Sequence, residues 1–350
     1  MKFYIGNSEL KGEALDEWAE KEAPYFSQIW IREIGKTIRE WYSDADHILI
    51  KTSGSTGSPK VIRLKKNQMS QSAIKTAERF GLKKGMISLN CLPSEYIAGK
   101  MMIIRALVIG LDQICIQPKV SLSIPIDRMI DFAAMTPMQA FVTSKDSPLS
   151  LNKIHSLILG GGPITNEISD LLQSLKTNCF ATYGMTETIT HVAVAPANGP
   201  GKSKVFEGIQ GVSFSTIDDC LVIEADHLDG LIETTDKVEL IDSTRFRWLG
   251  RKDNVINSGG VKIQAEELER RLDWLSDRFF IAGIPDQISG EQVVLVIEAQ
   301  PFNSDQMDFL QSKINEFKPI ERPKRIVFAE RLKETPTGKI LRKAELYLKV

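Results

Sequence analysis

Apolar and polar positions follow two different periods in the first half of the chain. Short apolar runs, which are typical of buried strands, occur at residues 47–50, 87–92, 113–116, 140–142 and 156–159. Between several of these runs apolar residues recur at helical spacing, which predicts helices at residues 69–80, 97–109, 125–135 and 166–175. Because strands that alternate with helices build parallel sheets, the pattern predicts an α/β fold with mostly parallel sheet layers.

The pattern differs at both ends of the chain. The first forty-odd residues are amphipathic and predict helices, with Trp18, Trp30 and Trp41 among their apolar anchors. Residues 205–248 contain strand-like segments separated by turn signals, which predicts a small β-rich subdomain. The last hundred residues predict a small α+β unit, with helices at 265–272 and 304–317 and strands at 279–283 and 292–298.

Length and a polar break together predict two domains. A chain of 350 residues is too long for one ordinary hydrophobic core. The polar segment Leu-Gly-Arg-Lys-Asp at 249–253 separates the β-rich segment from the last hundred residues. We therefore expect an N-terminal domain at residues 1–249, a hinge at 250–254 and a C-terminal domain at 255–350.

Composition and charge exclude several classes of protein. The chain is 42% apolar and 25% charged with a formal net charge of -1, so it has no overall basic character for nucleic-acid binding. No apolar run is long enough to cross a bilayer, and the first ten residues lack the apolar core of a signal peptide. We expect a cytoplasmic protein with small-molecule partners and no membrane insertion. The sequence does not indicate an oligomeric state.

The cysteines and histidines do not suggest a metal or redox site. Cys91, Cys115, Cys179 and Cys220 are widely spaced in apolar stretches, and no CxxC pair is present. The four histidines also lack the spacing of metal ligands. We expect the four cysteines to be buried free thiols.

A glycine- and hydroxyl-rich segment follows the first predicted strand. It contains Thr52, Ser53, Gly54, Ser55, Thr56, Gly57 and Lys60. Glycines allow backbone N–H groups to approach a polyanion, hydroxyls add donors, and the lysine adds positive charge. The segment is not a Walker A loop, because Lys60 does not follow a glycine and is followed by valine. It predicts a polyphosphate-binding loop, with a flexible Gly/Ser linker as the alternative.

Three other segments combine glycine turns with reactive side chains. The run Leu-Ile-Leu-Gly-Gly-Gly-Pro at 157–163 is a strand that enters a turn, where α/β proteins place their ligands. The run Tyr-Gly-Met-Thr-Glu-Thr at 183–188 offers an aromatic ring for a base, a hydroxyl for phosphate and a carboxylate for magnesium. The run Thr-Pro-Thr-Gly-Lys-Ile at 335–340 restrains a lysine with proline and glycine. The alternatives are plain turns with solvated charges.

In this order the segments resemble the adenylate-forming superfamily, which includes acyl- and aryl-CoA synthetases, luciferases and the adenylation domains of peptide synthetases. The resemblance covers about residue 47 to the C-terminus and implies an ATP-dependent ligase that uses Mg²⁺ and coenzyme A. It implies nucleotide contacts by the phosphate loop and by Gly161, Gly162, Pro163, Tyr183, Gly184, Thr186, Asp236 and Arg251. Glu187 would hold the magnesium ion, and Thr186 and Glu187 would also act in catalysis.

The resemblance also assigns roles in the predicted C-terminal domain. Lys339 is the implied catalytic lysine, whose charge would stabilise the oxygen charge that develops during adenylation. Asp253 is the implied hinge residue about which a mobile small domain rotates between the two half-reactions. The implied CoA contacts are Ser258, Gly259 and Gly260.

The chain departs from the family at two places that could affect which carboxylic acid it would activate. Its phosphate loop begins at residue 52, whereas typical members have a further subdomain before it, and Tyr96 stands where many members have histidine. On the helix that follows, Lys100 and Arg105 could bind a second carboxylate of a diacid, with solvation or a structural ion pair as the alternative.

Two runs, Tyr-Ile-Ala-Gly-Lys-Met-Met at 96–102 and Tyr-Gly-Met-Thr-Glu-Thr-Ile-Thr-His at 183–191, together with the short length resemble the 2-succinylbenzoate–CoA ligases of menaquinone synthesis, especially the shortened kind. The implied contacts with the acid include Gly184 and His191 beside Tyr96, Lys100 and Arg105. The expected reaction is ATP-dependent conversion of 2-succinylbenzoate to its CoA thioester. The alternatives are another acyl- or aryl-CoA ligase, an adenylation domain that loads a carrier protein in trans, and a non-catalytic nucleotide-binding homologue.

Overall fold

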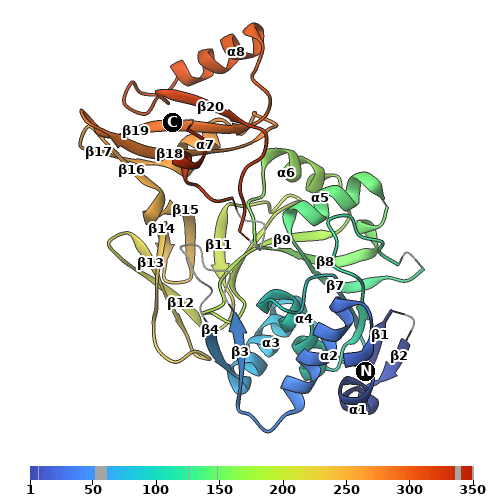
Figure 1. Ribbon diagram of the computed structural model, residues 1–350. Helices are drawn as coiled ribbons and strands as arrows, with labels where there is room; N and C mark the ends of the chain where they lie inside the picture. Colours follow the sequence, from blue (N-terminus) through green and yellow to red (C-terminus); the bar gives the residue numbers. More distant parts are fainter. Residues whose placement is uncertain (7, 52–60, 126, 148, 336–339, 349–350) are drawn as a thin grey trace. The chain divides into compact units, whose positions relative to one another are not determined.

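The computed structural model describes residues 1–6, 8–51, 61–125, 127–147, 149–335 and 340–348, which Figure 1 shows as coloured ribbons. These residues form two compact units. The first unit comprises Met1–Phe214, Ile223–Ile232 and Ile241–Phe246. The second comprises Ser215–Val222, Glu233–Leu240 and Arg247–Val350. The predicted hinge at 250–254 stays a prediction.

A mostly parallel sheet forms the centre of the first unit (Figure 1). Nine consecutive strands of this sheet are, in spatial order, β2 (Ser8–Lys11), β1 (Lys2–Ile5), β6 (Asp112–Cys115), β5 (Ile87–Asn90), β7 (Ile130–Met135), β8 (Ile154–Leu159), β9 (Asn178–Gly184), β10 (His191–Pro196) and β11 (Val205–Gly208). The six strands from β1 to β9 in this order pair in parallel, and β2 and β10 pair antiparallel with their neighbours. This confirms the predicted α/β class.

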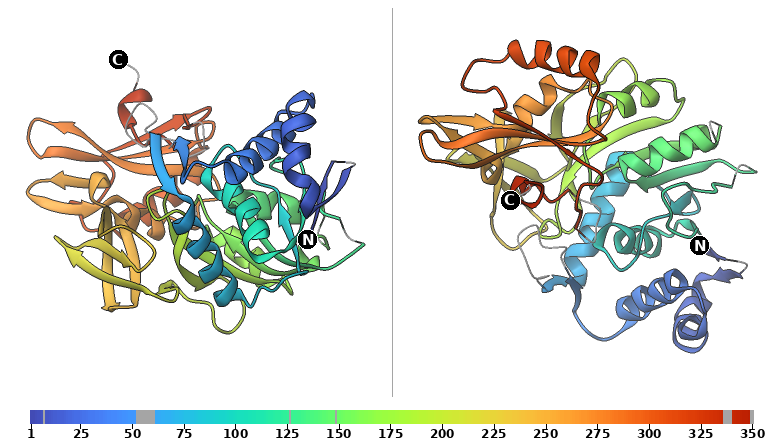
Figure 2. Two further views of the ribbon diagram at one scale, coloured as in Figure 1. Left: turned by 90° about the horizontal axis from the view of Figure 1, so that it is seen from below. Right: turned by 45° about the horizontal axis from the view of Figure 1, so that its top comes forward.

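Helices cover both faces of this sheet (Figure 2). They are α1 (Leu15–Lys21), α2 (Ile29–Tyr42), α3 (Lys66–Phe80), α4 (Ile97–Ile109), α5 (Pro137–Asp146) and α6 (Asn166–Gln173). One core joins Phe132 of β7 to Ile38 and Met102, on α2 and α4. A second core joins the neighbouring Ala133 to Ile168 of α6. Successive strand residues thus point into cores on opposite faces, as the pleat of a strand requires.

The predicted phosphate loop lies between two strands that form a separate hairpin. These strands, β3 (His47–Lys51) and β4 (Val61–Lys65), pair antiparallel with each other. Ile48, Ile50 and Leu64 of the hairpin are buried in one apolar cluster with Met69 of α3 and Met101 of α4. Burial of this apolar face fixes the two strands on which the loop begins and ends.

The next four strands after β11 contain residues of both units. They are β12 (Val212–Ile217), β13 (Cys220–Ala225), β14 (Ile232–Asp242) and β15 (Arg245–Arg251). The strand-rich character predicted for residues 205–248 is confirmed by these elements. Short 3₁₀ turns occur along the chain at η1 (Gly12–Ala14), η2 (Ala23–Tyr25), η3 (Leu151–Lys153), η4 (Lys252–Asn254) and η5 (Ala344–Leu346).

The second unit contains its own sheet and helices. Its strands are β16 (Val255–Ser258), β17 (Val261–Gln264), β18 (Arg278–Asp286), β19 (Gly290–Glu298) and β20 (Arg325–Ala329), and its helices are α7 (Ala265–Arg271) and α8 (Ser304–Asn315). The sheet order is β17-β16-β19-β18, and β20 pairs in parallel with β19. Leu268 and Leu310 of the two helices are buried with Leu295 of β19 in one core. The predicted α+β pattern is confirmed.

Two elements between residues 125 and 146 differ from the prediction. The predicted helix at 125–135 is wrong, because residues 130–135 form strand β7, and the predicted strand at 140–142 is wrong, because it lies within α5. Thr136 begins α5 with a capping box, in which its Oγ1 accepts from Gln139 N at 3.1 Å and Gln139 Oε1 accepts from Thr136 N at 3.0 Å. Pro137 at the first helical position favours the same start.

The N-terminus also differs in part from the prediction. Helices α1 and α2 confirm the amphipathic pattern, but the residues before them form β1 and β2. Phe3 of β1 pairs in parallel with Gln113 of β6 and is fully buried. A four-residue strand with two buried side chains, Phe3 and Ile5, is too short to show a period of its own.

The cysteines have the environment expected from the sequence. Cys91, Cys115, Cys179 and Cys220 are all free and buried. Burial raises the pKa of the Cys91 and Cys179 thiols to about 12, so both remain protonated at neutral pH. Among the residues that the structure describes, no helix is long and apolar enough to span a membrane.

Candidate active site

Part of the predicted site falls on residues that the structure does not describe. These residues are the phosphate-loop positions Thr52, Ser53, Gly54, Ser55, Thr56, Gly57 and Lys60 and the predicted catalytic residue Lys339. Their roles stay predictions. The described residues carry the other predicted contacts, and the flanking strands β3 and β4 are described on both sides of the phosphate loop.

The glycine turn after β8 lies against the end of β9. A Cβ atom on Gly160 would lie 2.6 Å from the Thr182 Oγ1, and that hydroxyl donates to the Leu159 carbonyl at 3.0 Å. Gly161 has a φ of +82°, a conformation that side chains with a Cβ rarely adopt. Gly161, Gly162 and Pro163 are exposed beyond this contact. The turn is therefore a fixed, accessible backbone surface at the carboxyl end of a parallel strand, where α/β proteins bind ligands.

The end of β9 requires a glycine for a different reason. A Cβ atom on Gly184 would lie 2.4 Å from the Thr190 carbonyl oxygen and 2.6 Å from the His191 Cα, so only glycine fits between the two strands. The Tyr183 ring makes edge-on contacts with Phe246 at 5.1 Å and Phe206 at 6.0 Å between ring centroids. These aromatic contacts hold a half-buried tyrosine at the point where the resemblance places the base.

The turn from Met185 to Thr190 is organised by a buried hydroxyl. Thr188 Oγ1 lies 2.7 Å from the Thr190 carbonyl oxygen and 3.0 Å from the Met185 carbonyl oxygen, which share its one proton, and it accepts from Met185 N at 2.9 Å. Ile189 has a φ of 67°, an outlier for a β-branched residue, and its N–H donates to the Thr186 carbonyl at 2.9 Å. The turn leaves Glu187 exposed and Thr186 half-buried at its apex.

At the base of the same turn lies a buried cation. Arg105 of α4 is 2% exposed, and its Nη2 donates to Thr190 Oγ1 at 2.7 Å. Its Nε has no hydrogen-bond partner among the described residues, and none of the ion pairs formed there joins Arg105 to a carboxylate. Burial lowers the pKa of Arg105 to about 9, so the guanidinium still carries its charge at neutral pH.

The predicted acyl-site residue His191 lies beside this cation. Its Nδ1 is 3.4 Å from Thr190 Oγ1 and its Nε2 is 3.4 Å from Thr76 Oγ1 of α3. Burial, with the nearby charges of Arg105 and Arg79, lowers the pKa of His191 well below its ordinary value. His191 is therefore a neutral hydrogen-bonding group at neutral pH, and the positive charge of this region belongs to the arginines.

The sequence did not single out the aromatic wall beside His191. Phe80 of α3 lies 5.2 Å from the ring of Phe180, 5.3 Å from that of Phe132 and 6.2 Å from that of His191. The Arg79 guanidinium lies 5.5 Å from the ring centroids of both Phe80 and Phe180. Phe80 appeared in the helical pattern, but the pattern marks it only as apolar. Its ring partners lie on strands β7, β9 and β10, far from Phe80 in the chain, so their proximity could not be read from the sequence.

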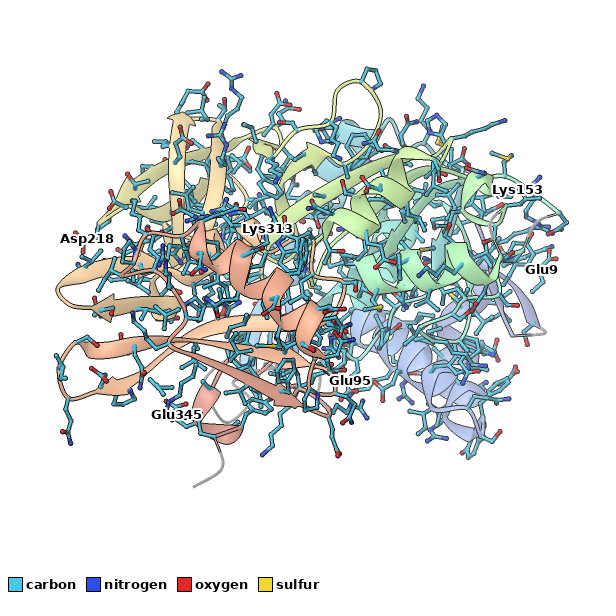
Figure 3. All side chains as sticks on the ribbon, turned by 90° about the horizontal axis from the view of Figure 1, so that it is seen from above. Glu9, Glu95, Lys153, Asp218, Lys313 and Glu345 are labelled. Atoms are coloured by element: carbon cyan, nitrogen blue, oxygen red, sulfur yellow. The ribbon has the colours of Figure 1, made fainter. Side chains whose placement is uncertain are left out.

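Lys100 has a different environment from Arg105, although both lie on α4. Its Nζ donates to Glu40 Oε2 at 2.6 Å and Thr37 Oγ1 at 3.2 Å, both on α2. Burial lowers the pKa of Lys100, and Glu40 opposes that shift. This is the structural ion pair that the sequence left open as the alternative. Tyr96, which precedes α4, is half-buried, and its neighbour Glu95 is exposed (Figure 3).

The ion pair between Lys100 and Glu40 gives a stability prediction. Lys100→Met should lower the free energy of unfolding by about 2–3 kcal/mol, below the usual cost of breaking a fully buried pair because Glu40 is 30% exposed. Urea denaturation would measure it, and the double variant Lys100→Met/Glu40→Gln should lose less than the sum of the single variants. A loss under about 0.5 kcal/mol for Lys100→Met would assign the pair to ordinary surface electrostatics.

Three other predicted residues lie in the second unit. Arg251 Nη2 donates to Thr235 Oγ1 at 2.7 Å and to Asp253 Oδ2 at 3.0 Å. Thr235 Oγ1 also donates to Asp253 Oδ2 at 3.3 Å. Asp236 is half-buried on β14, next to Thr235. The structure therefore brings Arg251 and Asp253 together with the neighbour of Asp236, while the ribose-binding and hinge roles stay predictions.

The predicted CoA segment is a tight hairpin turn. Ser258 and Val261 pair at the ends of β16 and β17, and Gly259 and Gly260 form the two-residue loop with φ values of +55° and +80°. Two residues with positive φ define the turn type that best matches the twist of a hairpin, and glycine adopts it without strain. The alternative given from the sequence, a hairpin turn, is thus present, and its role toward CoA stays a prediction.

Comparison with known proteins identifies the family. The model of the family described as "AMP-binding enzyme" matches residues 7–221, which is more than half of the chain. The chain belongs to the AMP-binding enzyme family. This confirms the family predicted from the order of the motifs.

Individual relatives are more distant. A crystal structure of an acyl-CoA synthetase (AMP-forming)/AMP-acid ligase II-like protein from Dyadobacter fermentans is 30% identical, with a TM-score of 0.62 over 92% of this chain and 95% of that one. O-succinylbenzoate coenzyme A synthetase from Bacillus subtilis, in complex with ATP and magnesium, shares the fold with a TM-score of 0.71 at 19% identity, over 84% of this chain and 68% of that one. A 2-succinylbenzoate–CoA ligase of Listeria monocytogenes is 22% identical over 87% of this chain and 70% of its own length.

Proposed function

We propose that the protein is an ATP-dependent, AMP-forming acid–CoA ligase, and that its acid is 2-succinylbenzoate. One observation carries the proposal. The turn between β9 and β10 presents Thr186 and Glu187 at its apex and, through Thr190 at its base, contacts the buried cation of Arg105. A single short segment thus joins the predicted nucleotide contacts to a charged group suited to an organic acid.

The family and the relatives support the two parts of the proposal to different degrees. Membership of the AMP-binding enzyme family supports ATP as the activating substrate. The B. subtilis protein was crystallised with ATP and magnesium, and relatives named 2-succinylbenzoate–CoA ligase support CoA and this acid. Because their identity to this chain is near 20%, the choice of acid depends on the acyl-site residues of the chain itself.

The first half-reaction would form an acyl-adenylate. A carboxylate oxygen of the acid attacks the α-phosphorus of ATP, the bond to the bridging oxygen breaks, and pyrophosphate leaves. The protein contributes mainly by positioning the reactants and stabilising charge. In this proposal the phosphate loop holds the triphosphate, Thr186 donates to a phosphate, and Lys339 offsets the negative charge that develops between the carboxylate and the α-phosphate.

The described residues fit a magnesium ion that arrives with ATP rather than one in a protein cage. No group of three His, Cys, Asp or Glu side chains among them could hold a metal. Glu187 offers one exposed carboxylate at the turn apex. A magnesium ion bound to phosphates commonly takes one or two protein carboxylates and keeps water on its other positions. When bound, it would neutralise phosphate charge, and Glu187 would hold it in place.

Arg105 is the group that favours a diacid. 2-Succinylbenzoate has two carboxylates, and only one of them can react with ATP in a given turnover. A guanidinium binds a carboxylate with two parallel hydrogen bonds, and the interaction is strong where water is excluded. With Thr190, neutral His191 and the Phe80 wall beside it, Arg105 would bind the unreacted carboxylate while the aryl group contacts the aromatic side chains. Lys100 does not share this role in the proposal, since Glu40 already neutralises it.

The second half-reaction would transfer the acyl group to CoA. The CoA thiolate attacks the acyl carbon of the adenylate, and AMP leaves with the electron pair of the broken carbon–oxygen bond. The proposal retains the hinge at Asp253 and the contacts of Ser258, Gly259 and Gly260 with CoA. The reaction would take place in the cytoplasm, where ATP and CoA are present, and would serve menaquinone synthesis.

Acid-dependent exchange of pyrophosphate into ATP tests the proposal and its rivals. Exchange with 2-succinylbenzoate, followed by thioester formation on addition of CoA, is the expected result. A preference for benzoate or a fatty acid would favour another acyl- or aryl-CoA ligase. Exchange without transfer to CoA would favour an adenylation domain that loads a carrier protein, and no acid-dependent exchange would leave a non-catalytic nucleotide-binding homologue.

A further inference from the structure

The chain segment that carries the predicted catalytic lysine is fixed on both sides within the second unit. Glu334 and Ile340 form an antiparallel bridge across the residues that the structure does not describe. Leu341 N donates to the Lys333 carbonyl at 2.8 Å, next to that bridge. Residues 333–334 and 340–341 therefore lie side by side, and Lys339 directly precedes Ile340 in the sequence.

A bidentate ion pair holds the chain just after that point. Arg342 Nη1 donates to Glu269 Oε2 at 3.0 Å, and Arg342 Nη2 contacts Glu269 Oε1. The same Nη2 donates to the Ile281 carbonyl at 3.1 Å, and Glu269 Oε1 accepts from Ile281 N at 2.7 Å. Arg342 is thereby attached to helix α7 and strand β18 at once, with the fork geometry that fixes direction as well as distance.

A second ion-pair group holds the chain before the segment. Arg278, at the start of β18, contacts Glu334 and lies 3.3 Å from Glu298 Oε2 of β19. Glu298 Oε2 also accepts from Leu332 N at 2.8 Å. Both flanks of residues 335–339 are thus joined by charged groups to the same sheet.

The pair of Arg342 and Glu269 is buried enough for its loss to matter. Burial raises the pKa of the Glu269 carboxyl, while Arg342 and the Ile281 N–H oppose that shift. A variant without the guanidinium leaves a carboxylate with reduced hydration and without its cation, which is costly. The geometry at Ile281 therefore depends on the arginine as well as on the glutamate.

The rest of the C-terminal segment has anchors that do not depend on Arg342. Ala344 is fully buried with Phe280 and Leu332 in one apolar cluster. The Tyr347 hydroxyl accepts from Lys333 N at 2.6 Å, and its ring lies 5.9 Å from that of Phe280. Loss of the Arg342 side chain should therefore change the direction of the chain near Ile340 without releasing the segment from the sheet.

We propose that Arg342, held by Glu269, is a positioning residue for the adenylation half-reaction, because it sets the direction of the chain at Ile340 and Leu341, which directly follow the predicted catalytic residue Lys339 in the sequence. The inference rests on the proposed function. It assigns Arg342 no contact with either substrate. Its effect passes through the two residues between it and the lysine, and a misplacement of about 1 Å of a catalytic group costs on the order of 10²-fold in rate.

Separate assays of the two half-reactions test this role in the full-length protein. We expect Arg342→Gln and Glu269→Gln each to slow pyrophosphate exchange with 2-succinylbenzoate by about 10²-fold. Thioester formation from CoA and preformed 2-succinylbenzoyl-adenylate should stay within about threefold of the wild type, because Lys339 serves only the first half. Arg342→Lys keeps the positive charge but loses the bidentate geometry. Its exchange rate should therefore be about tenfold higher than that of Arg342→Gln.

The control is Glu345→Gln, three residues further along the chain. Glu345 is exposed in η5 (Figure 3), and its substitution should leave both half-reactions unchanged. Thermal denaturation of each variant separates folding from positioning. If Arg342→Gln unfolds, the two half-reaction rates of the Arg342→Lys variant test the positioning role.

Two outcomes would overturn the inference. The first is an equal loss of both half-reactions in a folded Arg342 variant, and the second is an unchanged exchange rate in that variant. Failure of the proposed function is a different observation, because the wild type itself would then show no acid-dependent exchange.

Discussion

Lys339→Ala should slow adenylate formation by about 10²- to 10³-fold, while thioester formation from preformed adenylate stays within about threefold of the wild type. In the proposed mechanism the lysine charge acts when negative charge develops between the attacking carboxylate and the α-phosphate, and the proposed rotation about Asp253 would carry the lysine away before a thiolate displaces AMP. Its effect is therefore confined to the transition state of the first half.

The two rates are measured separately, by pyrophosphate exchange with 2-succinylbenzoate and by release of AMP after CoA is added to preformed adenylate. Lys333→Ala is a suitable control, because this lysine lies on the same segment and its described contacts are made by its backbone. A parallel loss in both assays for Lys339→Ala would remove the assigned role, since a general effect on folding or binding acts on both halves.

Arg105→Met should lower kcat/KM for 2-succinylbenzoate by about 10- to 10²-fold and change the value for benzoate by less than about threefold. The expected loss corresponds to a charge-assisted hydrogen-bonded interaction that is excluded from water. Benzoate has no second carboxylate, so it cannot lose that interaction. The ratio of the two values, measured by acid-dependent exchange, therefore isolates the contribution of the arginine to recognition of the diacid.

Lys100→Met provides the matched control on the same helix. It removes a buried cation from α4, but one that Glu40 already neutralises, so it should lower stability and affect both acids equally. If Arg105→Met also affected both acids equally, Arg105 would be a structural residue and the preference for a diacid would have no support from it.

Much of the fold of this protein follows from its periodicity. Helix α4 was expected at its observed bounds, 97–109, because a long apolar run with glycine at its end marks both its type and its limit. The errors at 130–135 and 140–142 have one cause. The helix predicted at 125–135 and the strand predicted at 140–142 both include apolar residues whose spacing fits a strand or a helix, and the capping box of Thr136 marks the start of α5 between them.

The candidate site was predictable to a smaller extent. The glycines at 161 and 184 and the turn of Tyr183 to Thr188 are local features, and their spacing marks them in the sequence. Lys100 and Arg105 show the limit of such reasoning, since both are cations on one helix. Lys100 binds Glu40, sixty residues earlier in the chain, whereas Arg105 binds Thr190, 85 residues later. The spacing of residues along a helix cannot predict these different partners, because they depend on which element packs against each side of α4.

The turn between β9 and β10 has a consequence for how each substrate affects the binding of the other. A ligand at Thr186 and one beside Thr190 would both restrict the same six residues, and the strained backbone of Ile189 lies between them. Binding of the first ligand would include most of the loss of conformational entropy on ordering the turn. The second ligand would then bind more tightly than it does to the free protein. Thermodynamic linkage makes this synergy reciprocal. ATP should lower the Kd of the acid by the same factor by which the acid lowers the Kd of ATP, and independent values in calorimetry would show that the turn is already fixed in the free protein.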